Sequence, residues 1–196
     1  WFGVGQGMHE MVLIGIGTGI GAGVILDGAV YRGATESAGE VGYMIPDRSM
    51  LKNAYPEYGP LEAILSNANI TDKGRRALAG QRPSQEIEAL TAPDVYKAAR
   101  QQEDWALQIT AEIADYLAIV IANITDLINP ELVVLGSGLA DAADILIPGI
   151  QQRIKNVLPH APRIEASSLG HRAVVMGAIA ITVHRSSDYY VVKKLY

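Results

Sequence analysis

The chain has 196 residues, a formal net charge of −5 and no cysteine. The acidic balance and the low aromatic content, 6% of residues, argue against a basic, base-stacking surface, so we expect no direct nucleic-acid binding. The absence of cysteine excludes disulfides and thiolate metal sites. No apolar run reaches the roughly 20 residues that span a membrane and no signal-peptide pattern is present, so we expect a cytoplasmic location and no membrane partner.

The first third of the chain is rich in glycine and predicts short β-strands. Residues 1–10 carry no capping signal and resemble the interior of a longer chain, so we expect a fragment. An Asp-Gly pair between the second and third apolar runs predicts a hairpin. The runs interpreted as strands of a β-meander are 11–14, 22–26, 29–31 and, as a fourth, 41–45.

The middle of the chain predicts a loop and then helices. Residues 47–60 are polar, contain prolines and predict an excursion loop. A helix begins in 61–66, and residues 71–92 predict short helical pieces at most. The clearest helical pattern covers 93–129 and ends at Asn129-Pro130. Its predicted core-facing stripe consists of Trp105, Ile109, Ile113, Tyr116, Leu117, Val120, Ile124 and Leu127.

The last third alternates strands and helices. Residues 131–135 predict a buried strand that leads through Gly136-Ser137-Gly138 into a helix. The other elements predicted here are a helix over 140–158, a strand over 163–165 and a small-residue helix over 172–184, with no prediction for the tail at 185–196. A meander followed by alternating helices and strands indicates an α/β fold with a mixed sheet.

Glycine occupies every second position of GIGTGIGAG, residues 15–23. Period-two spacing places these glycines on one face wherever the chain is extended. Two interpretations stay open: glycine serves the geometry of a tight β-turn, or the bare face lets a phosphate approach the backbone and the Thr18 hydroxyl. The second interpretation is favoured, because glycine weakens a strand unless something needs the space.

Gly136-Ser137-Gly138 lies between a predicted strand and a predicted helix, where α/β sheets bind ligands. By itself this turn is as consistent with a simple connection as with a binding site. Glu40, between two glycines, and Glu62, near a helix start, are by themselves more consistent with solvated acids than with ligand contacts.

Taken together, four segments in this order resemble the ROK family of repressors, open reading frames and kinases. The segments are LIGIGTGIGAGVILDGAVYRGATESAGEVG (13–42), YGPLEAILS (58–66), NPELVVLGSGLA (129–140) and SLGHRAVVMGAIAI (168–181). The resemblance implies an α/β actin-like ATPase fold, also described as ribonuclease H-like, with ATP and sugar bound between two lobes. It implies that residues 1–196 form the carboxyl-terminal lobe.

The resemblance also implies roles for individual residues. Gly17, Thr18 and Gly19 would face the phosphates of ATP, which is accompanied by Mg²⁺, and Gly136, Ser137 and Gly138 would lie on the adenosine side. The residues implied to contact sugar are Glu40, Glu62 and Tyr43. Two carboxylates suit a polyol, because their oxygens accept hydrogen bonds from its hydroxyl groups.

The zinc site of the family is missing. The family usually has a histidine and three cysteines at positions that here hold Tyr43, Asn53, Tyr55 and Pro60, and these residues make no tetrahedral zinc site. We therefore expect no bound metal apart from Mg²⁺ with the nucleotide, and a loop held by packing of Tyr55, Pro56, Tyr58 and Pro60. The four histidines show no ligand spacing: His9, His160, His171 and His184.

Three functions remain open, one of them a degenerate binding or scaffold lobe. The leading hypothesis is a lobe of an ATP-dependent sugar kinase that phosphorylates a hexose or amino-hexose. The family's general-base aspartate has no counterpart in residues 1–12, so we expect this fragment alone to be inactive. The alternative is the effector-binding lobe of a sugar-responsive transcriptional regulator, which the altered zinc loop and Tyr43 favour. In either case we expect a sugar as substrate or effector, and a homo-oligomer.

Overall fold

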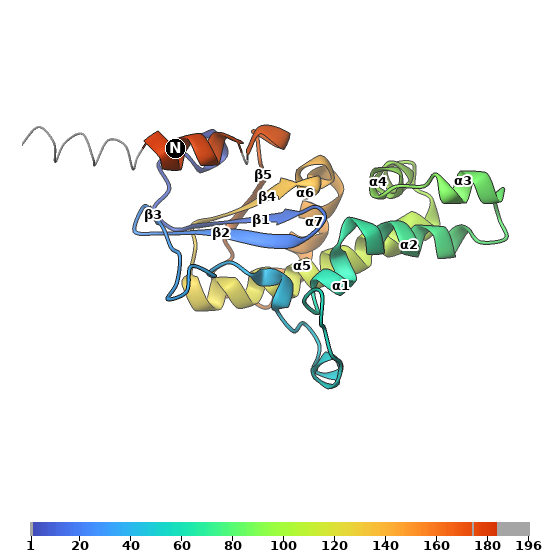
Figure 1. The fold of residues 1–196 in the computed structure, drawn as a ribbon, viewed down its shortest axis with the longest axis horizontal. Helices are drawn as coiled ribbons and strands as arrows, with labels where there is room; N and C mark the ends of the chain where they lie inside the picture. Colours follow the sequence, from blue (N-terminus) through green and yellow to red (C-terminus); the bar gives the residue numbers. More distant parts are fainter. Residues whose placement is uncertain (1, 174, 184–196) are drawn as a thin grey trace, which may run out of the picture.

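The computed structural model describes residues 2–173 and 175–183 (Figure 1). They contain a five-stranded mixed sheet in the order β3-β2-β1-β4-β5. β1 pairs antiparallel with β2 and parallel with β4; β2 pairs antiparallel with β3, and β4 parallel with β5. The strands are β1 (Met11–Ile16), β2 (Ile20–Leu26), β3 (Ala29–Val30), β4 (Leu132–Ser137) and β5 (Arg163–Ala166). The predicted meander and mixed sheet are confirmed.

The helices follow the predicted order, with different divisions. They are α1 (Glu62–Leu65), α2 (Asn67–Leu78), α3 (Ser84–Glu88), α4 (Ala92–Arg100), α5 (Asp104–Ile128), α6 (Gly138–Asp141) and α7 (Ala143–Ile154). Short 3-10 turns occur at Gly3–Gly5, Val41–Tyr43, Arg48–Lys52 and Gly170–Arg172. Residues 175–183 are helical, as predicted for the described part of 172–184, while the 185–196 tail lies outside the described residues.

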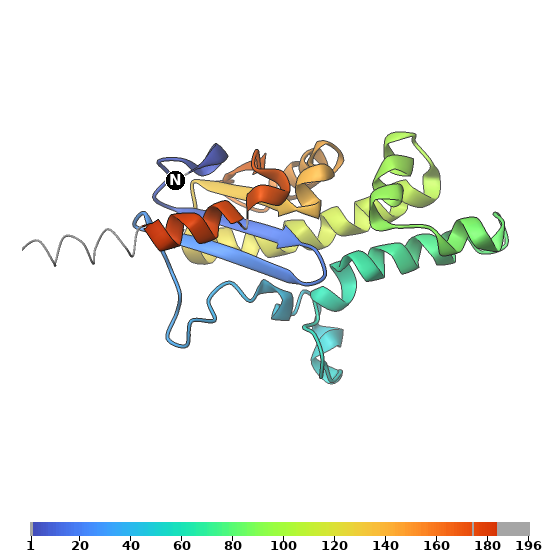
Figure 2. The same cartoon turned by 45° about the horizontal axis from the view of Figure 1, so that its top comes forward.

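The core lies between the sheet and α5 and α7. Along β1, Val12, Ile14 and Ile16 are buried and alternate with half-buried residues, so that one face of the strand packs inward. α5 carries a continuous buried stripe that includes Ile113, Leu117 and Ile121. The 175–183 helix lies on the opposite side of the sheet from α5 (Figures 1 and 2). The sheet is therefore covered unequally on its two faces.

α5 is the one described helix that is long and apolar enough to cross a membrane by length and composition. Half of its most apolar window is buried inside the protein, and α4 and α7 pack against it. It also carries Glu112, Asp115 and Asp126. These features are those of a core helix.

The predicted fourth strand over 41–45 is wrong. Val41–Tyr43 is a 3-10 turn in which the N–H groups of Tyr43 and Met44 bond to Glu40 and Val41. Val41 is buried, and the Gly39 carbonyl accepts a 2.7 Å hydrogen bond from the Ala22 N–H of β2. The segment packs against the sheet without adding a strand, because its N–H groups are used within its own turn.

The single helix predicted over 93–129 is two helices. Gln102 has a φ of 63°, a left-handed conformation that ends α4 and reorients the chain into α5. The predicted end at Asn129 is confirmed, with φ 53° in the left-handed cap. Leu127 was wrongly assigned to the core, since it is 82% exposed. Two further boundaries differ: α2 extends into the region predicted to hold short pieces, and the helix predicted over 140–158 divides into α6 and α7.

The 47–60 loop projects from the body of the protein, as predicted for an excursion (Figure 1). It contains the 3-10 turn Arg48–Lys52, whose first N–H groups are capped by Asp47. The predicted packing holds only in part: Pro60 is buried and Tyr55 half-buried, but Pro56 and Tyr58 are exposed. Aromatic and proline content alone did not give the direction of these side chains.

Candidate functional site

Two glycine-containing turns lie side by side at one edge of the sheet. Gly17-Thr18-Gly19 follows the carboxyl end of β1, and Gly136-Ser137-Gly138 forms the carboxyl end of β4 and the start of α6. β1 and β4 are parallel neighbours, with Gly15 opposite Gly136 and Ile16 opposite Ser137. The crevice beyond such strand ends is where α/β sheets bind ligands. The fold therefore brings together the two turns that sequence analysis singled out separately.

The first turn does not require glycine for its backbone. None of the glycines at 15, 17, 19, 21 and 23 has a positive φ, and a Cβ added at Gly17, Gly21 or Gly23 would meet nothing within 4 Å. A Cβ at Gly19 would make an ordinary 3.4 Å contact with Glu62. Gly15 is closely packed, since a Cβ there would lie 3.2 Å from Ser137 Oγ, but the turn-geometry interpretation leaves Gly17, Gly21 and Gly23 unexplained. Gly17 lies in the turn and the other two on β2, and all three leave open space beside the backbone.

The first turn also has hydrogen-bond donors that the described fold does not use. Gly17 donates to the Gly19 carbonyl at 2.9 Å, but the N–H groups of Thr18 and Gly19 have no partner among the described residues. Thr18 and Gly19 are exposed. Two free N–H groups and a hydroxyl in one short turn suit an anionic oxygen.

The second turn has an unusual backbone and a close contact. Ser137 has φ 51° and ψ −136°, a sparsely populated conformation for a residue with a side chain. A Cβ at Gly138 would lie 3.1 Å from the carbonyl oxygen of Ile16, which is tighter than most contacts. Glycine at 138 thus allows the second turn to lie close against the end of β1.

Glu62 lies next to the first turn. Its Oε2 accepts a hydrogen bond from the Ile20 N–H at 3.3 Å, and a Cβ added to Gly42 would lie 3.0 Å from the same oxygen. Glu62 begins α1 and is half-buried. Its carboxylate therefore lies between the start of β2, which follows the first turn, and the segment that follows Glu40. The assignment of Glu62 as a solvated first-turn acid is therefore incomplete.

Glu40 and Tyr43 lie on the segment that packs against β2. Both side chains are exposed, Tyr43 by 57%. The segment is held by the Gly39–Ala22 contact and by the hydrogen bond from the Leu61 N–H to the Gly42 carbonyl at 3.1 Å. These backbone contacts bring the segment carrying Glu40 and Tyr43 to the start of α1, where Glu62 lies.

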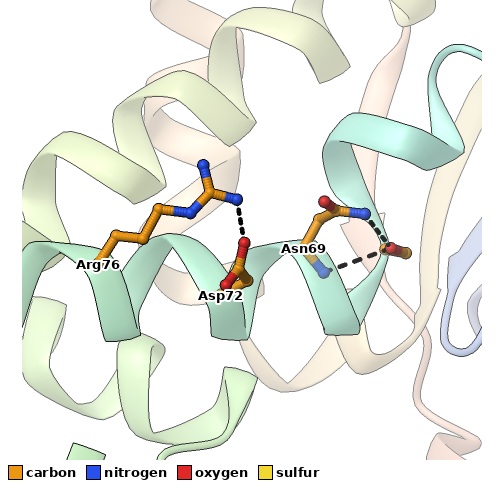
Figure 3. Close-up of polar contacts among 4 residues, drawn as sticks. Asn69, Asp72 and Arg76 are labelled. Atoms are coloured by element: carbon orange, nitrogen blue, oxygen red, sulfur yellow. Dashed lines mark hydrogen bonds and ion pairs between the residues drawn. The ribbon is translucent and has the colours of Figure 1, made fainter.

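Asn67 belongs to the same site and was missed by sequence analysis. Its N–H donates to the Gly17 carbonyl at 3.3 Å, and its side-chain amide lies near Gly138. The signal was Ser66, a typical N-cap residue, within the run Ser-Asn-Ala-Asn. Ser66 Oγ accepts hydrogen bonds from Asn69, which lies one helical turn ahead of the Asp72–Arg76 ion pair (Figure 3).

The 47–60 segment has its own polar contact. Asn53 donates to the Tyr55 hydroxyl at 3.4 Å, and Pro60 is buried beside α1. Within the described part of the chain, no group of three or more His, Cys, Asp or Glu residues is arranged to hold a metal ion. The residues at 43, 53, 55 and 60 do not fit zinc, because the set contains no imidazole, thiolate or carboxylate.

A concavity of about 420 Å³ lies elsewhere, between α3, α4 and the start of α5. In its wall, Glu103 accepts hydrogen bonds from Arg82 at 2.8 Å and from the Trp105 indole at 2.6 Å. None of the residues predicted to bind a ligand lines it. It is separate from the site at the strand ends.

The mixed sheet and its helical layer have the actin-like ATPase fold. Among solved structures, the chain is similar to a ROK family glucokinase from Streptomyces griseus in complex with glucose and AMPPNP, with a TM-score of 0.75. At 21% identity, and covering 91% of this chain and 62% of that one, the likeness concerns the fold alone. A sequence profile of the ROK family matches residues 1–185, and the chain belongs to this family.

Curated relatives include both enzymes and repressors. The chain is 33% identical over 189 residues to a glucokinase from Halalkalibacterium halodurans, covering 90% of this chain and 57% of the glucokinase. It is 28% identical over 192 residues to a putative xylose repressor from a Caldicellulosiruptor strain, covering 93% of this chain and 48% of the repressor. The chain thus spans about half the length of these relatives, which do not decide between kinase and regulator.

Proposed function

We propose that this chain is the sugar- and ATP-binding lobe of a ROK-type sugar kinase that phosphorylates a hexose or amino-hexose in the complete protein. The observation that carries the proposal is the open space beside Gly17, Gly21 and Gly23, whose backbones do not require glycine. A glycine-bare turn with free N–H groups and the Thr18 hydroxyl is suited to phosphate oxygens. The 33% identity to a glucokinase from Halalkalibacterium halodurans supports the same assignment.

In this proposal the nucleotide lies across the two turns. Thr18 and Gly19 donate to phosphate oxygens, and Gly136, Ser137 and Gly138 face the adenosine part. Mg²⁺ accompanies the phosphates and neutralises their charge. Glu40 and Glu62 accept hydrogen bonds from sugar hydroxyls, and Tyr43 lines the sugar pocket. The hydrogen bond from the Ile20 N–H to Glu62, whose carboxylate a Cβ at Gly19 would meet at 3.4 Å, supports a sugar site next to the phosphates, as phosphoryl transfer requires.

We assign no catalytic base to this chain. The carboxylates near the turns are those proposed to hold sugar, and Glu62 already accepts a hydrogen bond from the backbone. Residues 1–196 on their own are therefore expected to show no sugar-dependent ATP consumption. The complete protein is expected to act in the cytoplasm, as a homo-oligomer, with a sugar as its small-molecule partner and no zinc.

The alternative is the effector-binding lobe of a sugar-responsive transcriptional regulator. Two observations favour it: the zinc-ligand positions hold Tyr43, Asn53, Tyr55 and Pro60, and a putative xylose repressor is among the relatives. In that function Glu40 and Glu62 bind the effector sugar, and the open turn has no nucleotide to hold. Nucleotide binding therefore separates the two functions.

The test is ATP binding by the complete protein and its Gly19→Val variant, measured by calorimetry with Mg²⁺. Valine adds side-chain bulk to the turn that carries the free N–H groups, so we expect at least about a tenfold loss of ATP affinity, equivalent to roughly 1.4 kcal/mol. Because a side chain at residue 19 would face Glu62, sugar affinity measured without nucleotide shows whether the variant also disturbs the proposed sugar site. Equal ATP binding by both proteins would leave the glycines without a role in nucleotide binding, and no ATP binding by the wild type would favour the regulator.

A further inference from the structure

We infer that Asn67 is a nucleotide-contacting residue whose side-chain amide meets the phosphate–ribose part of the nucleotide. The inference rests on the proposed function, since it places a further residue between the two turns. It comes from the position of the residue and the unused hydrogen-bonding groups around it.

The backbone fixes where Asn67 lies. Ser66 is extended, with φ −61° and ψ 152°, and separates α1 from α2, so Asn67 is the first residue of a 12-residue helix. The Asn67 N–H donates to the Gly17 carbonyl, which attaches the start of α2 to the first turn. Ser66 itself is 94% buried, as its exposed fraction is 6%. The side chain of Asn67 therefore emerges from an anchored part of the chain.

The side chain reaches the second turn. A Cβ built on Gly138 would lie 3.6 Å from Asn67 Oδ1 and 3.8 Å from Asn67 Nδ2. The amide thus lies beside the position that a side chain at residue 138 would occupy, between the two turns. Among the described residues it has neither a hydrogen-bond donor nor an acceptor.

The surroundings of Asn67 favour an anion. In the first turn of α2, the N–H groups of Asn67, Asn69 and Ile70 bond to Gly17, Ser66 Oγ and the Ser66 carbonyl, while that of Ala68 has no described partner. The start of a helix carries a partial positive charge. The Asn67 amide donates through Nδ2 to a phosphate oxygen and accepts through Oδ1 from a ribose hydroxyl. A carboxylate at the same position would repel the phosphates.

The test compares Asn67→Asp, Asn67→Ala and the control Asn69→Asp in the complete protein, with ATP and Mg²⁺ as the probe in calorimetry. Asn69→Asp makes the same change two residues away, where the amide donates to Ser66 Oγ at 3.0 Å. We expect ATP affinity to fall at least about tenfold in Asn67→Asp, about three- to tenfold in Asn67→Ala and less than about threefold in the control. Sugar affinity without nucleotide should not change.

Stability separates this role from a structural one. An acid in the first turn of a helix interacts favourably with the macrodipole, so the melting temperature of Asn67→Asp should not fall. Normal ATP binding by both Asn67 variants, with Gly19→Val impaired, would overturn the inference and leave the proposed function intact. A wild-type protein that does not bind ATP would overturn both. Loss of ATP and sugar binding together with a lower melting temperature would make Asn67 a structural residue.

Discussion

Gly39 and Gly21 lie close together, but a side chain would clash at Gly39 and would fit at Gly21. A Cβ at Gly39 would lie 1.9 Å from the Ala22 carbonyl oxygen, and its φ is +92°, whereas a Cβ at Gly21 would meet nothing within 4 Å. Glycine at 39 therefore holds the segment of Glu40 against β2. Glycine at 21 is not needed by the described fold.

We expect Gly39→Ala to lower the free energy of unfolding by about 2–4 kcal/mol, because the backbone must move and a left-handed residue gains a side chain. Gly21→Ala should change it by less than about 0.5 kcal/mol. Urea denaturation of the two variants measures both values. Similar losses in both would contradict the contacts described for Gly39.

Glu40 allows a test of sugar binding without loss of fold. Its side chain is exposed, so Glu40→Gln should leave the unfolding midpoint unchanged. If Glu40 accepts hydrogen bonds from sugar hydroxyls in the complete protein, the variant should lose roughly 1–3 kcal/mol of sugar binding free energy by calorimetry. Glu57→Gln, an exposed glutamate of the 47–60 loop, is the matched control. Equal sugar affinity in wild type and Glu40→Gln would remove Glu40 from the sugar site.

For individual residues, the sequence predicted most members of the candidate site, but not all of their contacts. The two turns and Glu62 were found from their spacing and from the family resemblance, and the fold places them together. Asn67 was not found, because its direction depends on the extended Ser66 that separates α1 from α2. A one-residue break between helices leaves little trace in hydrophobic periodicity.

Among the elements, α4 is attached to the start of α7 by one arginine. Arg100 donates to Asp144 through Nε at 2.8 Å and through Nη2 at 2.7 Å, and Nη2 also contacts the Asp141 carbonyl at the end of α6. The hydrogen bond from Arg100 lowers the pKa of Asp144, and Asp144 in turn raises the pKa of Arg100. These contacts of Arg100 attach α6, which begins at Gly138, and the start of α7 to α4.

Arg100→Leu should lower the free energy of unfolding at pH 7 by about 1 kcal/mol, a modest value because both side chains are partly exposed. Since the folded-state pKa of Asp144 is depressed, the pair stabilises the fold above the unfolded pKa and the contribution is lost as pH falls through the folded value. The difference between the two proteins should therefore shrink below about pH 4. Urea denaturation at pH 7 and pH 3.5 measures it. A difference that grows with acid would contradict the assigned pair.

The element boundaries show what local sequence encodes. Asn129 before a proline predicted a helix end, and it adopts the left-handed cap. Gln102 adopts the same conformation, but glutamine has no particular preference for it, so the break between α4 and α5 was not predicted. Residues 41–45 have the composition of a strand, yet their N–H groups turn back within the segment. Tertiary packing decided these two cases.

For the whole molecule, metal content tests the alignment of the 47–60 loop with the family. The ligand positions Tyr43, Asn53, Tyr55 and Pro60 cannot form a tetrahedral zinc site, so the purified protein should contain no stoichiometric zinc. Plasma mass spectrometry of the protein after dialysis against zinc-free buffer measures it. About one zinc per chain would show that other residues bind the metal and that the loop is aligned wrongly.

The order of the sheet has a consequence for how the candidate site comes into being during folding. The two turns meet only where β1 pairs with β4, and those strands lie about 120 residues apart in the chain. The β1–β2 hairpin and the helices from α1 to α5 can form from local contacts, whereas closing so long a loop is slow. We expect the two turns to come together late, after the hairpin and the helices between the strands have formed. Partly folded chains would then be helical and compact before they can hold a ligand across both turns.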